Sequence, residues 1–258
     1  MKTSLAGRTL CILGGSGYVG SAIASKAIDL GAKVYCVNRS GKLNAPAPWV
    51  EKVTWIKGDA MSPNDFSDVL AESEAVVHSI GTLFDTSITK MRRPGAEGTY
   101  EHMNRETAKA IGLKLNELKG NKKIVYLSAS KSPPFISRYL TTKIEAEDFL
   151  FNLPDVRTSV LRPGFISSET RLSKQLLKYP VNIYSSIFNF FDGITPYESR
   201  LKPFVKKFEV DKSIDMRSVV ISALICCFDP KFDDKILYNA DMKELKELFL
   251  EHGYEFPS

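Results

Sequence analysis

Short apolar runs alternate with longer segments of helical periodicity through residues 9–165. The short runs are rich in β-branched residues, which is typical of strands buried on both faces of a parallel sheet. They predict six strands, at Thr9–Leu13, Lys33–Val37, Val53–Lys57, Ala75–Ser79, Lys123–Leu127 and Thr158–Leu161. The segments between them predict helices at Tyr18–Leu30, from a capping Ser62 and Pro63 onward, at about Glu97–Lys119 and at about Ser137–Asn152. This alternation predicts a doubly wound α/β domain built on a parallel sheet.

The pattern changes after Gly164. Residues 170–212 mix lysines with aromatic side chains, and the remaining chain predicts a helix at Met216–Phe228, a short strand at Ile236–Asn239 and an amphipathic helix at Met242–His252. We therefore expect a parallel-sheet domain over residues 1–166 and a small C-terminal cap over residues 167–258 that packs on the same domain. Three interpretations of the aromatic stretch 178–212 stay open: the wall of an apolar pocket, a surface that contacts a membrane or a partner subunit, or a cap core with a solvated basic face.

Composition excludes several classes of protein. Of the 258 residues, 43% are hydrophobic and 25% are charged, close to the averages of soluble globular domains. Lys plus Arg (35) exceed Asp plus Glu (30), a balance that suits an anionic ligand and is too weak to indicate nucleic acid. The four cysteines and three histidines lack the spacing of a disulfide framework or a metal site, so no metal is expected. No segment approaches the ~20 apolar residues of a membrane helix. We expect neither a signal peptide nor an ordinary transit peptide, because the first nine residues lead straight into a strand.

A glycine-rich turn follows the first predicted strand directly. It fits both G-x-G-x-x-G and G-x-x-G-x-x-G, and it consists of Gly14, Gly15, Ser16, Gly17, Tyr18, Val19 and Gly20. The glycines permit a tight turn, allow the backbone to approach a pyrophosphate, and let the following helix pack closely on the sheet. The positive end of that helix would then face the phosphates. Strand, turn, helix and second strand together predict a Rossmann fold that binds a dinucleotide; the alternative is a glycine-rich turn without a ligand.

The end of the second strand bears on the choice of cofactor. An NAD-selective site usually carries an acidic residue there to bond the ribose hydroxyls, whereas this chain has Asn38, Arg39 and Ser40. A neutral residue removes the repulsion of a 2′-phosphate, and a guanidinium can bind phosphate with two hydrogen bonds. The sequence therefore predicts NADP(H) in preference to NAD(H), unless Arg39 is a solvated surface residue. Further contacts to the adenosine part are expected from Asp59, Ala60 and Gly81, which follow the third and fourth strands.

Tyr139 and Lys143 form a Y-x-x-x-K pair at the start of the helix that follows the fifth strand. Residues four apart share a helix face, so the Lys143 ammonium can stabilise a tyrosinate at Tyr139. Tyr139 could then exchange a proton with a substrate oxygen while hydride moves to or from nicotinamide, and Lys143 could also hold the nicotinamide ribose. Ser128 and Ser130 end the fifth strand at the same edge, where a hydroxyl would polarise the substrate oxygen. The alternative is a surface Tyr and Lys in a protein that binds the cofactor without turning it over.

Together these residues resemble the short-chain dehydrogenase/reductase superfamily in its extended or atypical branch. The matching features cover about residues 8–166 and are Gly14, Gly17 and Gly20, Gly58-Asp59, Asn104, Tyr139-x-x-x-Lys143 and Leu161–Gly164. Two segments, Val37–Gly41 and Arg138–Glu147, are similar to the group that contains the NADPH-binding accessory subunit of mitochondrial complex I. The short length is most similar to the fungal relative of that subunit in the coenzyme Q biosynthetic complex.

The resemblance implies a mitochondrial protein at the matrix side of the inner membrane, associated with subunits of the coenzyme Q biosynthetic complex. It implies an NADP(H)-dependent oxidoreductase that acts on a quinone-like precursor in ubiquinone biosynthesis. Two alternatives stay open: a non-catalytic cofactor-binding subunit that stabilises a quinone-synthesis or respiratory complex, and a sugar-nucleotide epimerase or dehydratase. The last would need a second nucleotide site in the C-terminal part, and the short aromatic-rich stretch argues against one.

Overall fold

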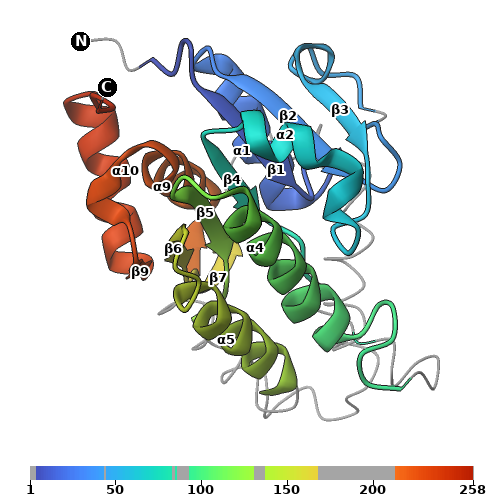
Figure 1. Ribbon diagram of the computed structural model, residues 1–258. Helices are drawn as coiled ribbons and strands as arrows, with labels where there is room; N and C mark the ends of the chain where they lie inside the picture. The colour runs from blue at the N-terminus through green and yellow to red at the C-terminus, as the bar shows by residue number, and fades with distance from the viewer. Residues whose placement is uncertain are drawn as a thin grey trace, which may run out of the picture.

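Residues 4–43, 45–82, 85, 93–130, 137–167 and 213–257 are described by the computed structural model of the protein. At their centre lies a sheet of seven parallel strands in the order β3-β2-β1-β4-β5-β6-β9 (Figure 1). The strands are β1 (Thr9–Leu13), β2 (Lys33–Asn38), β3 (Thr54–Lys57), β4 (Ala75–His78), β5 (Lys122–Leu127), β6 (Val156–Leu161) and β9 (Lys235–Leu237). The order of the first six is that of two mononucleotide-binding halves, which confirms the predicted doubly wound Rossmann fold.

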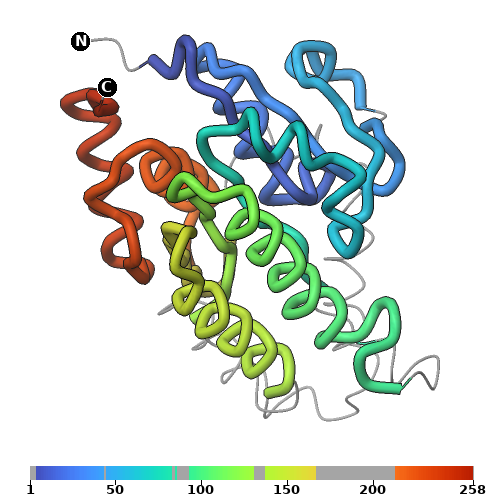
Figure 2. Tube along the Cα trace, in the orientation of Figure 1, coloured from blue at the N-terminus to red at the C-terminus, as the bar shows by residue number. Residues whose placement is uncertain are grey.

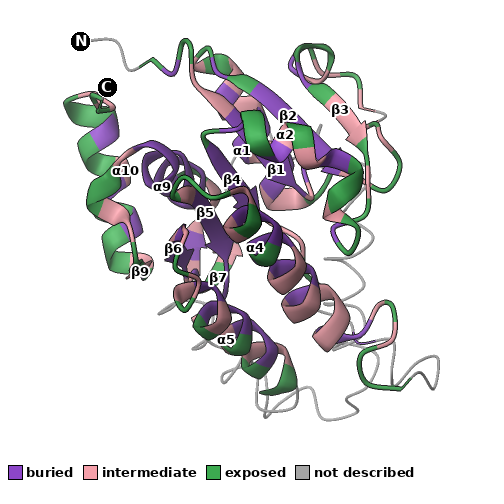
Figure 3. Ribbon diagram, viewed as in Figure 1, coloured by how far each residue is buried: buried purple, intermediate pink, exposed green. Residues whose placement is uncertain are grey.

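Helices cover both faces of this sheet, with their buried residues turned toward it (Figures 1 and 3). One face carries α1 (Tyr18–Asp29) and α9 (Met216–Phe228), and α10 (Asn239–Glu251) packs on α9. The opposite face carries α2 (Ser67–Glu72), α4 (Thr107–Leu118) and α5 (Ser137–Phe151). The shorter elements are the 3₁₀ turns η1 (Val50–Lys52), η2 (Pro63–Phe66) and η5 (Pro230–Phe232), the π-helical segment η3 (Glu101–Glu106), and the parallel pair of β7 (Phe165–Ser167) and β8 (Ser213–Asp215).

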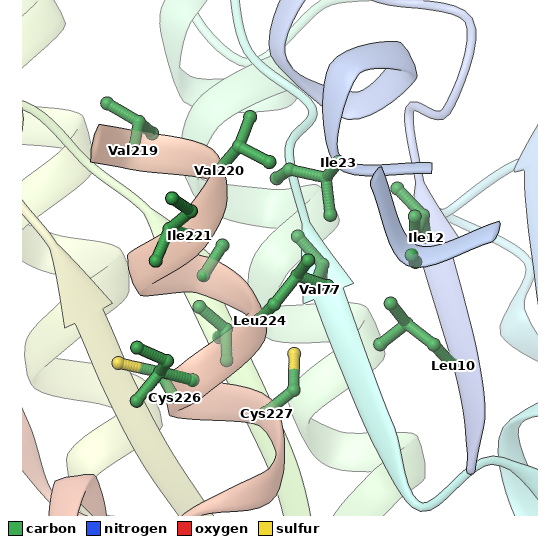
Figure 4. Packing of buried hydrophobic residues seen from close by; sticks show 14 of the residues in the cluster. Leu10, Ile12, Ile23, Val77, Val219, Val220, Ile221, Leu224, Cys226 and Cys227 are labelled. Carbon is green, nitrogen blue, oxygen red and sulfur yellow. The ribbon is translucent and has the colours of Figure 1, made fainter. Parts of the chain in front are cut away.

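Two hydrophobic clusters, one on each face, hold the helices to the sheet. Alternate residues of β1 point to opposite faces, so Leu10 and Ile12 join the cluster under α1 and α9, while Cys11 and Leu13 join the cluster under α4 and α5. Figure 4 shows the first cluster, in which the apolar side chains of α9 lie against Ile23 of α1 and Val77 of β4, with Leu10 and Ile12 of β1 beyond them. Helix α9 is almost wholly buried because the sheet covers one side and α10 the other, which explains its uniformly apolar sequence.

Two helix starts differ from the prediction. Gly98 adopts a positive φ of 84°, so the chain turns there, and the expected long helix begins later, with η3 followed by α4. Ser62 precedes η2 without a side-chain capping bond, and α2 begins only at Ser67. Just before η2, the Asp59 side chain accepts the Met61 N–H at 3.0 Å and the Asp59 carbonyl accepts the Ser62 N–H at 2.8 Å, which closes a turn over residues 59–62. The helical turn η2 thus starts at Pro63, as expected, but without the expected side-chain cap.

The described C-terminal elements complete the sheet. Strand β9 pairs with β6, and α9 covers the same face as α1, so these elements pack on the same domain as the N-terminal strands. About half of the predicted cap, residues 168–212, lies outside the described residues, and the aromatic stretch 178–212 lies wholly within that part. The division at residue 166 stays a prediction. The two ends of the described chain meet where the Arg8 side chain donates to the Pro257 carbonyl (Figure 2).

The described ranges contain neither a membrane-spanning helix nor a group of metal ligands. No helix within them has the length and hydropathy to cross a membrane. No three His, Cys, Asp or Glu side chains in the same part of the chain are grouped so that they could hold a metal ion.

Candidate functional site

The glycine turn between β1 and α1 lies at the carboxyl edge of the sheet. Gly14 has a φ of 82°, which glycine adopts without strain, and its carbonyl accepts the Gly17 N–H at 2.8 Å. A Cβ at Gly20 would lie 2.4 Å from the Gly14 oxygen, and a Cβ at Gly15 would lie 2.3 Å from the Cys36 sulfur. The turn therefore holds the start of α1 closer to the sheet than side chains at these positions would permit.

The N-terminus of α1 fits a phosphate group. Its cap residue is Gly17, which supplies no side-chain acceptor for the first backbone N–H groups, and Ser16 and Gly17 are exposed. Tyr18 and Val19 form the first turn of the helix, and Val19 packs against the core. Backbone N–H groups and the positive end of the helix dipole favour an anion at such a point. The described residues therefore fit the pyrophosphate of a dinucleotide.

Asn38 shapes the turn that follows β2. Its side-chain oxygen accepts the Gly41 N–H at 2.6 Å and the Ser40 hydroxyl at 3.1 Å, and its amide donates to the Lys42 carbonyl at 3.0 Å. Asn38 is thus engaged by its own turn. The neighbouring Arg39 is exposed at the carboxyl edge of the sheet.

The end of β3 adjoins this turn. The Gly58 N–H donates to the Asn38 carbonyl at 3.0 Å, which places the following residue, Asp59, at the same edge. Asp59 is exposed, and one of its carboxylate oxygens accepts the Met61 N–H at 3.0 Å. Ala60 is buried in the hydrophobic cluster under α4 and α5. The structure therefore brings Asp59, but not the Ala60 side chain, to the predicted adenosine site.

Lys143 is buried beneath the ends of β4 and β5. Its ammonium donates to the Leu127 carbonyl at 2.7 Å and to the Ile80 carbonyl at 3.4 Å, and the residue is only 3% exposed. A Cβ at Gly81 would lie 3.0 Å from the ammonium nitrogen, so a glycine allows the chain after β4 to pass this close. Burial lowers the pKa of Lys143 to about 7, and the nearby Glu147 carboxylate acts in the opposite direction.

Tyr139 lies in the first turn of α5. Its ring packs edge-on against Tyr100, with the ring centroids 5.8 Å apart. The preceding residue, Arg138, forms ion pairs with Asp85 at 2.9 Å and with Glu101. These contacts fasten the start of α5 both to the segment after β4 and to η3, and they fix the backbone that carries Tyr139.

Asn104 connects three of these elements from within η3. Its side-chain oxygen accepts the Thr82 N–H at 3.0 Å, and its amide donates to the Thr142 hydroxyl at 3.4 Å. Its backbone carbonyl accepts the Tyr126 hydroxyl at 2.7 Å. Single π-helical turns inside helices occur frequently at functional sites. Asn104 therefore joins the chain after β4, strand β5 and helix α5 at the point where Lys143 is buried.

The two predicted serines have different surroundings. Ser128 is buried, and its hydroxyl donates to the carboxylate of Glu147, a residue with no exposed surface. Arg162 binds the same carboxylate through two nitrogens, one of them Nε at 3.0 Å from Oε2. Ser130 is half-buried, and its backbone N–H donates to the Pro163 carbonyl at 2.9 Å. The Ser128 hydroxyl is therefore hydrogen-bonded in the interior of the fold, whereas Ser130 lies nearer the carboxyl edge of the sheet.

A buried histidine that the sequence analysis did not single out lies next to this site. His78 ends β4 without exposed surface, and its ring lies 5.4 Å from that of Tyr126. Its Nε2 lies 3.2 Å from the Thr107 hydroxyl, and its Nδ1 has no hydrogen-bond partner among the described residues. Burial, reinforced by the charge of Lys143, lowers the pKa of His78 to about 3.

We expect His78 to destabilise the fold in mild acid. Because its pKa in the folded protein lies below the ordinary value of 6.5, the unfolded chain binds the proton more readily. Stability is therefore lost as the pH falls from 6.5 toward 3, and this group accounts for about 2 kcal/mol between pH 7 and pH 5.

Urea titrations at pH 7 and pH 5 measure this loss for the wild type, His78→Gln and the exposed control His252→Gln. His78→Gln should lose about 2 kcal/mol less than the wild type over this interval, and His252→Gln should lose as much as the wild type. An equal loss in all three proteins would contradict a buried neutral His78.

Three residues complete the site without having been predicted: Glu97, Glu147 and His78. Glu147 carries a recognisable signal, because it lies four residues after Lys143 on the same helix face. Glu97 forms an ion pair with Arg39 at 3.0 Å, but no local spacing links two residues so far apart in the chain. His78 lies at the end of a correctly predicted strand, and only the packed structure shows toward which face of the sheet its side chain points.

Comparisons with known proteins agree with this geometry. A family model described as NAD(P)H-binding matches residues 14–180. An uncharacterized chloroplastic protein of Arabidopsis thaliana is 35% identical over 168 residues, covering 63% of this chain and 52% of the relative. Component 2 of the MIOREX complex of Saccharomyces cerevisiae is 29% identical over 206 residues, covering 63% of this chain and 74% of the relative. The chain thus spans about half the length of the Arabidopsis relative.

Solved structures show the same fold. A short-chain dehydrogenase/reductase superfamily protein from Agrobacterium tumefaciens, with bound NAD, has a TM-score of 0.60 and 15% sequence identity over 97% of this chain and 84% of that chain. The family match covers the glycine turn, the edge of the sheet and helix α5. The fold is that of this short-chain dehydrogenase/reductase structure, and the chain belongs to the family that the matching model describes as NAD(P)H-binding.

Proposed function

We propose that the protein is an NADP(H)-dependent oxidoreductase that acts on a quinone precursor in ubiquinone biosynthesis. The observation that carries the proposal is that α5 and the glycine turn start at the same edge of the sheet, with Tyr139 in the first turn of α5 and Lys143 buried behind it. NADPH supplies a hydride when it is bound. Tyr139 donates a proton to the substrate oxygen, and Lys143 orients the nicotinamide ribose and stabilises the tyrosinate. Ser130 polarises the same oxygen, because the Ser128 hydroxyl donates to Glu147.

Arg39 supports NADP(H) as the cofactor in preference to NAD(H). It is exposed at the edge where the adenosine ribose would lie, and the residue before it, Asn38, carries no charge to repel a phosphate. A guanidinium binds a phosphate through two parallel hydrogen bonds, which an ammonium cannot do. Arg39→Ala is therefore the variant that removes the preference in this proposal.

The substrate class, the partners and the location rest on likeness to other proteins. The segments Val37–Gly41 and Arg138–Glu147 resemble the group that contains the NADPH-binding accessory subunit of mitochondrial complex I. The fungal relative of that subunit belongs to the coenzyme Q biosynthetic complex, which supports a quinone-like substrate and partners in that complex. The yeast relative is named as a component of a complex, and the Arabidopsis relative as chloroplastic. These names support a role for this protein in a protein complex inside an organelle. We place the protein at the matrix side of the mitochondrial inner membrane, with peripheral contact to the membrane.

One observation favours a second candidate, a cofactor-binding subunit without turnover. The polar groups nearest the proposed chemistry are engaged within the fold: the Lys143 ammonium donates to the Leu127 carbonyl, and the Ser128 hydroxyl donates to Glu147. In such a protein the bound cofactor would stabilise the fold and, through it, the assembly.

Oxidation of NADPH in the presence of a panel of quinone-ring precursors tests the proposal, with cofactor binding measured on the same samples. We expect turnover of at least one precursor by the wild type. Binding without turnover of any precursor, together with full rescue of quinone synthesis in cells by the Tyr139→Phe/Lys143→Met double variant, would exclude the oxidoreductase and favour the non-catalytic subunit.

A further inference from the structure

The Arg39–Glu97 ion pair crosses the edge of the sheet at the predicted cofactor site. Arg39 follows β2, and Glu97 lies in the segment between β4 and η3. Strands β2 and β4 are the two neighbours of β1, and both segments leave the sheet at its carboxyl edge. An ion pair between them therefore spans the carboxyl end of β1, which carries the glycine turn. This is where the adenosine part of a dinucleotide held by that turn would lie.

Glu97 lies within two consecutive turns of the backbone. Gly95 and Gly98 on either side of it have φ values of 87° and 84°, which glycine adopts readily. The Thr99 N–H and hydroxyl both bind the Ala96 carbonyl, at 3.1 and 2.8 Å, and Thr99 is fully buried. The backbone that carries Glu97 is thus anchored in the core, and its carboxylate is held toward Arg39.

We propose that Glu97 is a specificity-determining residue, which lowers the preference for NADPH over NADH by competing with the 2′-phosphate for Arg39. The inference rests on the proposed role of Arg39 in binding that phosphate. The carboxylate of Glu97 accepts from Nη1 of Arg39 at 3.0 Å, and a phosphate would use the same donors. A bound 2′-phosphate must displace the carboxylate and then lies near its negative charge. NADH carries no such phosphate and is not subject to this competition.

The exposure of the pair limits the size of the effect. The side chains of Arg39 and Glu97 are 69% and 64% exposed, so water and salt screen their interaction. Loss of the Glu97 charge should therefore change the affinity for a 2′-phosphate by about two- to ten-fold. The change should be larger at low ionic strength than at high ionic strength.

Titrations of NADPH and NADH into the wild type and four variants test this inference. The variants are Glu97→Gln, Arg39→Ala, the double variant of these, and Glu117→Gln, which removes a charge from another exposed glutamate, the ion-pair partner of the buried Lys114. We expect Glu97→Gln to bind NADPH about two- to ten-fold more tightly and NADH within about two-fold of the wild type. Arg39→Ala should weaken the binding of NADPH but not that of NADH, and Glu117→Gln should change neither affinity. The gain in NADPH affinity from Glu97→Gln should be smaller when Arg39 is absent.

The outcomes separate this inference from the proposed cofactor preference. If Arg39→Ala weakens the binding of NADPH but Glu97→Gln leaves the ratio of the NADPH and NADH affinities unchanged, the proposed role of Glu97 is wrong. The proposed preference for NADPH over NADH is then unaffected. If the Glu97→Gln gain is as large without Arg39 as with it, the competition for Arg39 is wrong. If Arg39→Ala does not alter the ratio, the proposed preference fails, and the inference about Glu97 fails with it.

Discussion

Replacement of Tyr139 by Phe is expected to lower turnover by about 10²- to 10⁴-fold, the usual contribution of a positioned proton donor. The affinity for NADPH should stay within about two-fold of the wild type, since the variant loses one oxygen and keeps the ring that packs against Tyr100. Steady-state kinetics with a quinone precursor, together with a binding titration, separate the two effects. Undiminished turnover in Tyr139→Phe would contradict the assigned proton donor.

Lys143→Met should lower both turnover and the affinity for NADPH, whereas Tyr139→Phe should lower turnover alone. The change keeps a long side chain in the buried space but removes the ammonium that donates to the Leu127 and Ile80 carbonyls. Because this ammonium is assigned both to the ribose and to the tyrosinate, we expect loss of turnover together with weaker NADPH binding. A variant that loses turnover but binds NADPH as tightly as the wild type would remove the ribose role from Lys143.

Arg162→Met is expected to lower the free energy of unfolding by about 3 kcal/mol. The variant leaves the Glu147 carboxylate, which has no exposed surface, without its ion-pair partner; among the described residues the Ser128 hydroxyl still donates to it, and the Lys143 ammonium lies nearby. Removal of one member of a buried ion pair costs more than removal of both, because a lone charge stays in the interior. Urea denaturation of Arg162→Met and of the Glu147→Met/Arg162→Met double variant measures this difference.

The double variant should recover most of the stability lost in the single variant, since apolar side chains of similar volume can replace a buried ion pair at little cost. Recovery would show that the cost of Arg162→Met arises from the unpaired Glu147 and not from lost packing of the arginine. If Arg162→Met costs less than about 1 kcal/mol, or if the double variant is less stable than Arg162→Met, the buried pair does not have the role that the structure gives it.

Most of the sheet was predictable from the sequence because β1, β2, β4, β5 and β6 are buried on both faces. The apolar run Thr9–Leu13 and its counterparts need no knowledge of their neighbours to be identified as parallel strands, and the structure has β1 with the same bounds. Helix starts were less predictable, because they depend on the local backbone geometry. Ser62 makes no side-chain capping bond and is followed by a 3₁₀ turn, and before η3 the chain turns at Gly98, which has a positive φ.

The candidate site was predictable where its chemistry is local and was not where it depends on contacts across the fold. The glycine turn and the pair of Tyr139 and Lys143 are recognisable within a few residues of chain. The engagement of Ser128 by Glu147 and of Arg39 by Glu97 requires the packed structure, because these partners come from separate elements. The same holds for the burial that lowers the pKa of Lys143 to about 7.

Both the cofactor and the chemistry proposed for this protein require that the backbone of the glycine turn binds the diphosphate of NAD(P)H. Gly17 offers a way to test it without disturbing the fold. It is the cap residue of α1, with φ −77° and ψ 171°, an extended conformation open to any residue, and a Cβ there would approach only the Gly14 oxygen, at 3.1 Å. Aspartate and asparagine are both favoured helix caps, so Gly17→Asp and Gly17→Asn should keep the helix stable. Only the aspartate places a negative charge where the diphosphate is expected.

Calorimetric titration of NADPH into the wild type, Gly17→Asp and Gly17→Asn is the most direct measurement. We expect the wild type to bind NADPH at one site, and Gly17→Asp to bind it at least about ten-fold more weakly than Gly17→Asn. If the wild type binds neither NADPH nor NADH, or if the two variants bind NADPH equally tightly, the glycine turn is not the diphosphate site.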